Sequence, residues 1–135
     1  MSKKTYPINI RFNDLDSMNH VNNAVYITYF EQARMEYFAD VIGISWDWTV
    51  VGILLARNEV DYKLPLFLHD EAQVEIWVSH IGTKSMEMSY RIIKKQKGDW
   101  VTCTTGKSVL VCFDYKNNKT IPIPEKWKTA IGSEV

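Results

Sequence analysis

The side chains best able to do chemistry are concentrated in one short polar stretch that follows the first predicted strand. It holds two carboxylates, an imidazole and two amides: Asp14, Asp16, His20, Asn22 and Asn23. An apolar segment with helical spacing follows at once, so the stretch ends where a helix is expected to begin. The first N–H groups of a helix have no partner within it and lie at the positive end of its dipole. A carboxylate beside such groups could therefore act on a carbonyl, whose oxygen the N–H groups would bind.

The elements that must position these side chains follow from hydrophobic periodicity. Alternating polar and apolar residues predict strands, and apolar residues at helical spacing predict a long helix ended by Gly43. Pro124 predicts the start of a short C-terminal helix. The predicted strands span about 6–12, 50–62, 72–78, 86–95 and 100–114, and the predicted helices about 22–42 and 125–131.

This order of elements predicts an α+β fold, with one long central helix wrapped by a curled antiparallel sheet of about five strands. We expect residues 1–135 to form a single domain, because 135 residues with 46% hydrophobic content can bury a core without metals or disulfides. A sheet of this size leaves strand edges exposed. Pairing two copies edge to edge would cover one of them, so we expect a homodimer or a homotetramer built as a dimer of dimers.

Composition excludes several classes of partner. The 16 basic and 16 acidic side chains balance, so no overall field favours nucleic acid or an anionic membrane. The longest uncharged apolar run, 48–56, is too short to span a membrane, and the N-terminal basic pair has no apolar segment behind it. We therefore expect a cytoplasmic protein.

The two cysteines and the histidines suggest no metal site. Cys103 and Cys112 lie nine residues apart in one predicted strand. They should point to opposite faces and cannot pair with each other there. Neither lies near a His-rich cluster with the spacing of metal ligands, and no zinc motif is present.

A combination of motifs resembles a known family. Asp14-Leu-Asp16, His20-Val-Asn-Asn23, Tyr26 and the run Tyr29-Phe-Glu-Gln-Ala-Arg34 together resemble the hotdog-fold thioesterases of the 4-hydroxybenzoyl-CoA thioesterase family. The order strand, helix and four strands matches that fold over nearly the whole chain. The resemblance implies an acyl-CoA thioesterase that hydrolyses its substrate to free acid and coenzyme A.

The resemblance also implies roles for particular residues. Asp16 takes the position of the catalytic carboxylate, and the backbone N–H near Asn23 that of the donor to the thioester oxygen. Members of the family bind coenzyme A at the subunit interface with residues at the start of the fourth strand, where this chain has Lys84 and Ser85. Arg57, midway along a predicted strand, is a weaker candidate for the same contact.

The chain departs from the family in two places. Asn19 and His20 stand where the aromatic-substrate branch has glycine and aliphatic residues, which favours a fatty acyl substrate. Met18 stands where plant acyl-carrier-protein thioesterases have an asparagine, so their Asn/His mechanism is not expected here. Tyr26 is first a core residue and also a candidate for the acyl tunnel.

The mechanism stays open at this stage. Asp16 could attack the carbonyl carbon directly or orient a water as general base, and His20 would orient rather than transfer protons. No metal or cofactor is expected, because the thiolate of coenzyme A is a good leaving group. The aspartates could also simply stabilise the turn, and Asn22 and Asn23 are favoured helix caps.

Two alternative functions use the same features. One is hydrolysis of acyl groups from acyl carrier protein. The other is a protein that binds acyl-CoA without cleaving it, although a pure binder has no need of a carboxylate beside an uncapped helix start.

Overall fold

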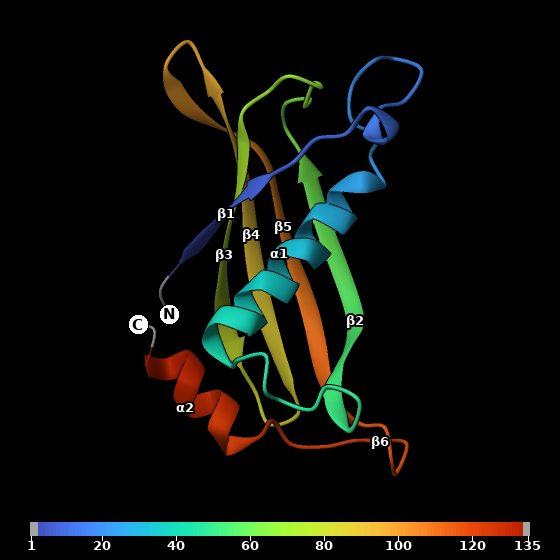
Figure 1. The fold of residues 1–135 in the computed structure, drawn as a ribbon, viewed down its shortest axis with the longest axis vertical. Coiled ribbons are helices and arrows are strands. Elements are labelled where there is room, and N and C mark those ends of the chain that lie inside the picture. Colours follow the sequence, from blue (N-terminus) through green and yellow to red (C-terminus); the bar gives the residue numbers. More distant parts are fainter. Residues whose placement is uncertain (1–2, 134–135) are drawn as a thin grey trace.

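The computed structural model describes residues 3–133 and shows one helix lying across an antiparallel sheet (Figure 1). A second helix lies beyond the C-terminal end of the first (Figure 1). The elements in chain order are β1 (Lys4–Ile8), the 3-10 turn η1 (Phe12–Asp14), α1 (Val25–Val41), β2 (Val51–Tyr62), β3 (Ala72–Ile81), β4 (Ser85–Gln96), β5 (Asp99–Asp114), β6 (Lys119–Thr120) and α2 (Glu125–Ser133).

The sheet has the order β1-β3-β4-β5-β2, and every neighbouring pair is antiparallel. Strand β6 pairs with the end of β5, off this path. Strands β1 and β2 form the two edges. The described part of the chain is therefore an α+β fold in which the sheet curls around α1.

The core lies between α1 and the inner face of the sheet. Phe30 of α1 is fully buried and stacks on Tyr90 of β4, with ring centroids 4.3 Å apart. The same ring lies against Gly106 of β5, where an added Cβ would be 2.6 Å from Phe30 Cε2. The absence of a side chain at Gly106 thus lets the helix approach the sheet closely.

Helix α2 closes the core at the C-terminal end of α1. Trp127 of α2 is fully buried, and its ring contacts those of Trp46 and Trp48, at centroid distances of 5.1 and 5.2 Å. Phe38 of α1 belongs to the same aromatic cluster. These contacts hold the connection between α1 and β2 in place.

The first strand is shorter than the sequence predicts. Its ladder runs from Lys4, opposite Ile76, to Ile8, opposite Ala72, and β3 begins at Ala72. Beyond Ile8 the chain has no strand to pair with, so the predicted strand over 6–12 is wrong at its C-terminal end. Phe12 instead begins η1 and is 77% exposed.

The start of α1, the end of α2 and the number of strands also differ from the prediction. Helix α1 begins at Val25 rather than near residue 22, because the chain turns first and Val25 N–H donates to Asn22 O at 2.9 Å. Helix α2 continues to Ser133. The sheet has six strands rather than five, because Asn118 adopts a left-handed φ of 55° and the turn there returns the chain to pair beside Phe113.

The two cysteines do not point to opposite faces. Both are buried, at 0% and 1% exposure. The ladder between β4 and β5 pairs Ile92 with Thr104 and Ile93 with Thr102, which leaves Cys103 as the extra residue of a bulge. A bulge reverses the inward and outward alternation of a strand, so Cys103 and Cys112 both contribute to the core.

No helix within residues 3–133 has the length and apolar character needed to cross a membrane.

Candidate active site

A tight loop between η1 and α1 carries the predicted chemical residues. Leu15 and Val21 form an isolated antiparallel bridge, and Asp16 N–H donates to His20 O at 3.0 Å. Asn19 closes the loop with φ of 64°, a left-handed conformation that asparagine adopts more readily than most residues. The loop thereby places the side chains of Asp16 and His20 next to each other.

Asp14 anchors this loop to the helix. Its carboxylate is almost fully buried and accepts hydrogen bonds from Arg11 N–H at 2.9 Å and from Tyr29 Oη–H of α1 at 2.8 Å. Burial alone would raise the pKa of Asp14, but these two hydrogen bonds and the nearby Arg11 guanidinium outweigh it and lower the pKa below its ordinary value of 3.8. Asp14 is thus an ionised structural carboxylate with its oxygens already occupied.

Asp16 is in a different environment. Its side chain is 26% exposed, and one oxygen accepts a hydrogen bond from Met18 N–H at 2.9 Å. The other oxygen lies 3.7 Å from His20 Nδ1, slightly beyond hydrogen-bond distance. Asp16 therefore keeps one oxygen accessible beside an imidazole.

The turn ahead of α1 leaves the backbone N–H of Asn23 free. Ala24 N–H donates to Asn22 Oδ1 and Val25 N–H to Asn22 O, both at 2.9 Å. Asn23 N–H precedes both of these donors in the chain, and nothing in residues 3–133 accepts a hydrogen bond from it. The side chain of Asn22, rather than that of Asn23, satisfies the turn that precedes the helix.

Asn23 and His20 line one open cavity of about 200 Å³. Asp16 is not one of the lining residues, but its Oδ2 lies 3.7 Å from Nδ1 of His20. Tyr26 and Tyr62 form one wall, with ring centroids 5.1 Å apart. Burial raises the pKa of both phenols, so both are neutral near pH 7.

Both phenols hold backbone at the cavity. Tyr62 Oη–H donates to Asn23 O at 2.8 Å, and Tyr26 Oη accepts from Leu66 N–H at 3.2 Å. The segment 63–70 completes the wall through Leu64 and Pro65. Tyr62 therefore holds the backbone of Asn23, and Tyr26 ties the segment 63–70 to α1.

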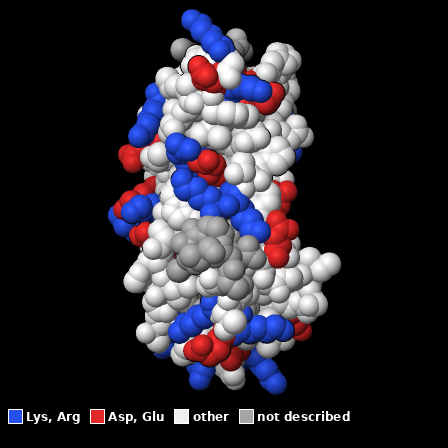
Figure 2. Space-filling model, turned by 90° about the vertical axis from the view of Figure 1, so that its left-hand side faces the viewer, with Lys and Arg blue, Asp and Glu red and all other residues white. Residues whose placement is uncertain are grey.

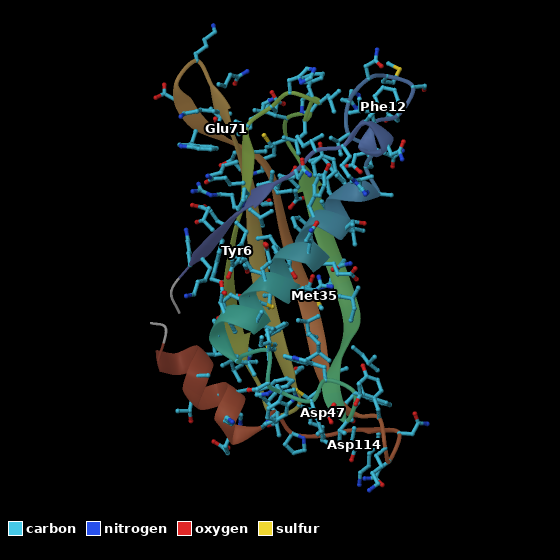
Figure 3. The ribbon with its side chains drawn as sticks, viewed as in Figure 1. Tyr6, Phe12, Met35, Asp47, Glu71 and Asp114 are labelled. Carbon is cyan, nitrogen blue, oxygen red and sulfur yellow. The ribbon has the colours of Figure 1, made fainter. Side chains whose placement is uncertain are left out.

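The predicted contacts to coenzyme A lie elsewhere in the chain. Ser85, next to Lys84, begins β4 opposite Val111 of β5, whereas Tyr62 at the cavity is opposite Thr104. These positions on β5 are separated by about 23 Å at roughly 3.3 Å per residue. Figure 3 shows the two ends, with Phe12 and Glu71 near the cavity and Asp47 and Asp114 at the far end. One chain does not bring Lys84 and Ser85 to Asp16.

Arg57 also lies away from the cavity. Its guanidinium is two-thirds exposed and forms an ion pair with Glu59 of the same strand. It is opposite Val109, about 16 Å along the sheet from the Tyr62 end at roughly 3.3 Å per residue.

Sequence reasoning missed three residues that shape the site. Tyr62 is the last residue of β2, Leu66 lies in a proline-containing turn, and Lys94 is one of two adjacent lysines in β4. Strand alternation indicates that one of those lysines points inward, but which one depends on the strand's register. No signal in the sequence links Tyr62 or Leu66 to the helix start.

No group of three or more potential metal ligands occurs within residues 3–133.

Comparison with known proteins identifies the family. The sequence profile of the thioesterase-like superfamily matches residues 10–131. The long-chain acyl-CoA thioesterase FadM of Escherichia coli is 25% identical over 117 residues, which cover 86% of this chain and 87% of FadM. A 1,4-dihydroxy-2-naphthoyl-CoA hydrolase of Synechococcus elongatus is 22% identical over 87% of this chain and 86% of its own length.

A solved structure shares both sequence and fold. A thioesterase from Thermus thermophilus, crystallised with coenzyme A and zinc, is 32% identical and superposes with a TM-score of 0.80 over 96% of this chain and 92% of its own. The fold described above is therefore the hotdog fold that the motifs predicted. The chain belongs to the thioesterase-like superfamily and is a thioester hydrolase.

Proposed function

We propose that this protein hydrolyses the thioester of a fatty acyl-CoA, with Asp16 as the reacting carboxylate and Asn23 N–H as the donor to the carbonyl oxygen. The observation that carries the proposal is the free N–H of Asn23, a residue that lines the same cavity as His20, with Asp16 Oδ2 3.7 Å from His20 Nδ1. Asp14, the only other acidic side chain of this loop, already has its oxygens occupied.

The chemistry requires a fixed donor and an available carboxylate. As the thioester carbon is attacked, negative charge develops on the carbonyl oxygen, and a preorganised N–H stabilises it without reorganisation. One such donor lowers a barrier by about 2.7–4 kcal/mol. Asp16 either attacks the carbon and expels the coenzyme A thiolate, which leaves a mixed anhydride that water then hydrolyses, or removes a proton from a water that attacks the carbon and expels the thiolate. His20, 3.7 Å from Asp16, orients the carboxylate.

An aliphatic acyl group fits the apolar cavity between α1 and β2. This cavity is about 380 Å³, at the lower end of the range for ligand pockets. Its lining includes Met35, Phe38, Trp48 and Ile53. It lies toward the C-terminal end of α1, about 22 Å along the helix from Asn23 at 1.5 Å per residue. Within one chain, it is too far from Asp16 to hold a short acyl group attached to the reacting carbonyl.

A two-fold dimer would bring together the groups that lie far apart in one chain. These are Lys84 and Ser85, which are distant from Asp16, and the apolar cavity, which is distant from Asp16 as well. Strand β2 is a sheet edge, and two antiparallel copies of it around a two-fold axis reverse end for end. The far end of the partner would then lie beside the Asp16 end of this chain. In that arrangement the partner subunit's Lys84 and Ser85 could reach the coenzyme A phosphates, and the partner's apolar cavity could receive the acyl group.

Charge gives little support to an acyl-carrier-protein substrate. An acidic carrier would need a basic face to dock on. On the face seen in Figure 2, lysines and arginines lie interspersed with acidic residues, and the whole chain is neutral.

The decisive experiment measures hydrolysis of acyl-CoAs of increasing chain length by the wild type and by Asp16→Asn, with an aromatic acyl-CoA and an acyl carrier protein thioester in parallel. We expect the wild type to prefer aliphatic acyl-CoA. Asp16→Asn should lose at least about 10³-fold in kcat while still binding the substrate, because it removes the reacting group and little volume.

Asp14→Asn serves as the matched control and should keep most of the activity if it folds. Wild-type rates in Asp16→Asn would refute the role of Asp16. Tight acyl-CoA binding with no hydrolysis by the wild type would favour the non-catalytic alternative.

A further inference from the structure

A buried lysine outside the catalytic loop has no role in the mechanism described so far. Lys94 is the last inward-facing residue of β4, and its side chain is 6% exposed. Its neighbour Lys95 is 47% exposed and pairs loosely with Glu71 at 3.8 Å. Burying an ammonium is costly unless its donors are satisfied, so a function specific to Lys94 must be sought in its contacts.

The ammonium of Lys94 faces the segment 63–70. Nζ donates to Pro65 O at 2.8 Å, lies 3.3 Å from Asp70 Oδ2, and is 5.1 Å from the centre of the Phe67 ring. Asp70 Oδ2 also accepts from Phe67 N–H at 2.8 Å. The ammonium thus contacts a carbonyl, a carboxylate and an aromatic face that all belong to a single turn.

The segment 63–70 also contacts the candidate active site. Leu66, between two of the residues bound by Lys94, is fully buried, and its carbonyl accepts from Val21 N–H at 2.9 Å. Its N–H donates to Tyr26 Oη of α1. The Phe67 ring stands edge-on to His20, with centroids 6.4 Å apart. The turn therefore contacts both the residue after His20 and the first turn of the helix.

We propose that Lys94 is a positioning residue that acts as a clamp: it fixes the segment 63–70 in place. Through Leu66 and Phe67, this segment then keeps His20 and the Asn23 N–H aligned with Asp16. The inference rests on the proposed function, because it assigns Lys94 to the same site. Lys94 itself would not contact the substrate. A misplacement of about 1 Å at a reacting centre costs roughly 10²-fold in rate, so a loosened clamp should reduce kcat strongly.

The test compares Lys94→Met with Lys95→Met, its exposed neighbour in the same strand. Lys94→Met should lower kcat on acyl-CoA by about 10²-fold, with KM changed by less than about threefold, because alignment rather than coenzyme A binding is lost. Lys94→Arg, which keeps the cation, should recover part of kcat. Lys95→Met should behave as the wild type.

Amide hydrogen exchange supplies a readout that does not depend on activity. In Lys94→Met the Val21 and Leu66 amides should exchange faster, while that of Ile76 in the sheet should be unchanged. If Lys94→Met does not fold, Asp70→Asn gives the same comparison with a smaller fall in kcat.

Wild-type kcat in a folded Lys94→Met, or in Asp70→Asn where that variant must be used, would overturn the inference. If the wild type hydrolyses no thioester, the proposed function fails, whereas the exchange of Val21 still tests the clamp.

Discussion

At the scale of single residues, two aspartates of one loop have different surroundings, which is why we propose different roles for them. Asp14 is buried, and its oxygens accept three hydrogen bonds. Asp16 is a quarter exposed and accepts one hydrogen bond, from Met18 N–H. A carboxylate that already accepts several hydrogen bonds is a poor nucleophile or base, so the geometry favours Asp16 for chemistry and Asp14 for stability.

Replacing Asp14 with Asn should destabilise the protein by about 1–3 kcal/mol near pH 7, because a buried charged acceptor is lost. The pKa of Asp14 is lower in the folded state than its ordinary value of 3.8. Its contribution is therefore fully present above about pH 4 and is lost as the pH falls through the folded-state pKa. Urea unfolding of both proteins between pH 7 and pH 2.5 measures the difference.

The difference in the free energy of unfolding between the wild type and Asp14→Asn should become smaller as the pH falls toward 2.5. A gap that stays constant over the whole range would show that Asp14 is not ionised in the folded protein.

At the scale of elements, the site depends on how closely α1 lies on the sheet. The helix carries Phe30 against Gly106, and the same helix begins two residues after the candidate donor, Asn23. Strand β2 also positions the candidate donor, because its last residue, Tyr62, donates a hydrogen bond to Asn23 O. Helix position and donor position are therefore set together by packing along the whole helix.

Gly106→Ala should destabilise the fold by about 1–3 kcal/mol, as overpacking does in cores. The added Cβ would lie 2.6 Å from Phe30 and 2.9 Å from Glu59 O, and the second atom is backbone that cannot easily move. Thermal and denaturant unfolding measure the change.

Gly132→Ala in α2 is the control, because a Cβ there meets nothing within 4 Å. It should be neutral or stabilising by up to about 1 kcal/mol. Equal stabilities of the two variants would contradict the close packing at Gly106.

At the scale of the whole molecule, the β2 edge is the surface on which the proposed dimer rests. Strand β2 has no partner on its outer side in the described chain, and its consecutive residues Leu54 and Leu55 are 38% and 47% exposed. Met35 of α1, on the same side, is 67% exposed (Figure 3). Exposed apolar side chains beside an unpaired strand edge are typical of an interface.

Leu55→Lys should convert a dimer to a monomer and abolish hydrolysis at the same time, since the proposed site needs residues of both subunits. Sedimentation velocity and the acyl-CoA assay measure the two properties on the same samples. Trp100→Lys, which changes a residue of similar exposure on the β4–β5 hairpin, should leave both unchanged. A fully active monomer would refute the shared site.

The sequence by itself determined the order of the elements and the stretch that carries the chemistry. Alternation and helical spacing reflect which residues face the core, and this pattern can be recognised within a short stretch of sequence. The sequence also showed the cluster of Asp14, Asp16 and His20, because these residues are close to one another in the chain. The thioesterase family, predicted from those motifs, was confirmed.

Tertiary structure decided what depends on partners distant in the chain. The end of β1 was set by where β3 begins, and the faces of the cysteines by a bulge opposite β4. The burial of Lys94 rather than Lys95 followed from strand register and from a turn that lies 24 positions away at Asp70. Such features arise only when separate segments meet, so no local pattern could have shown them.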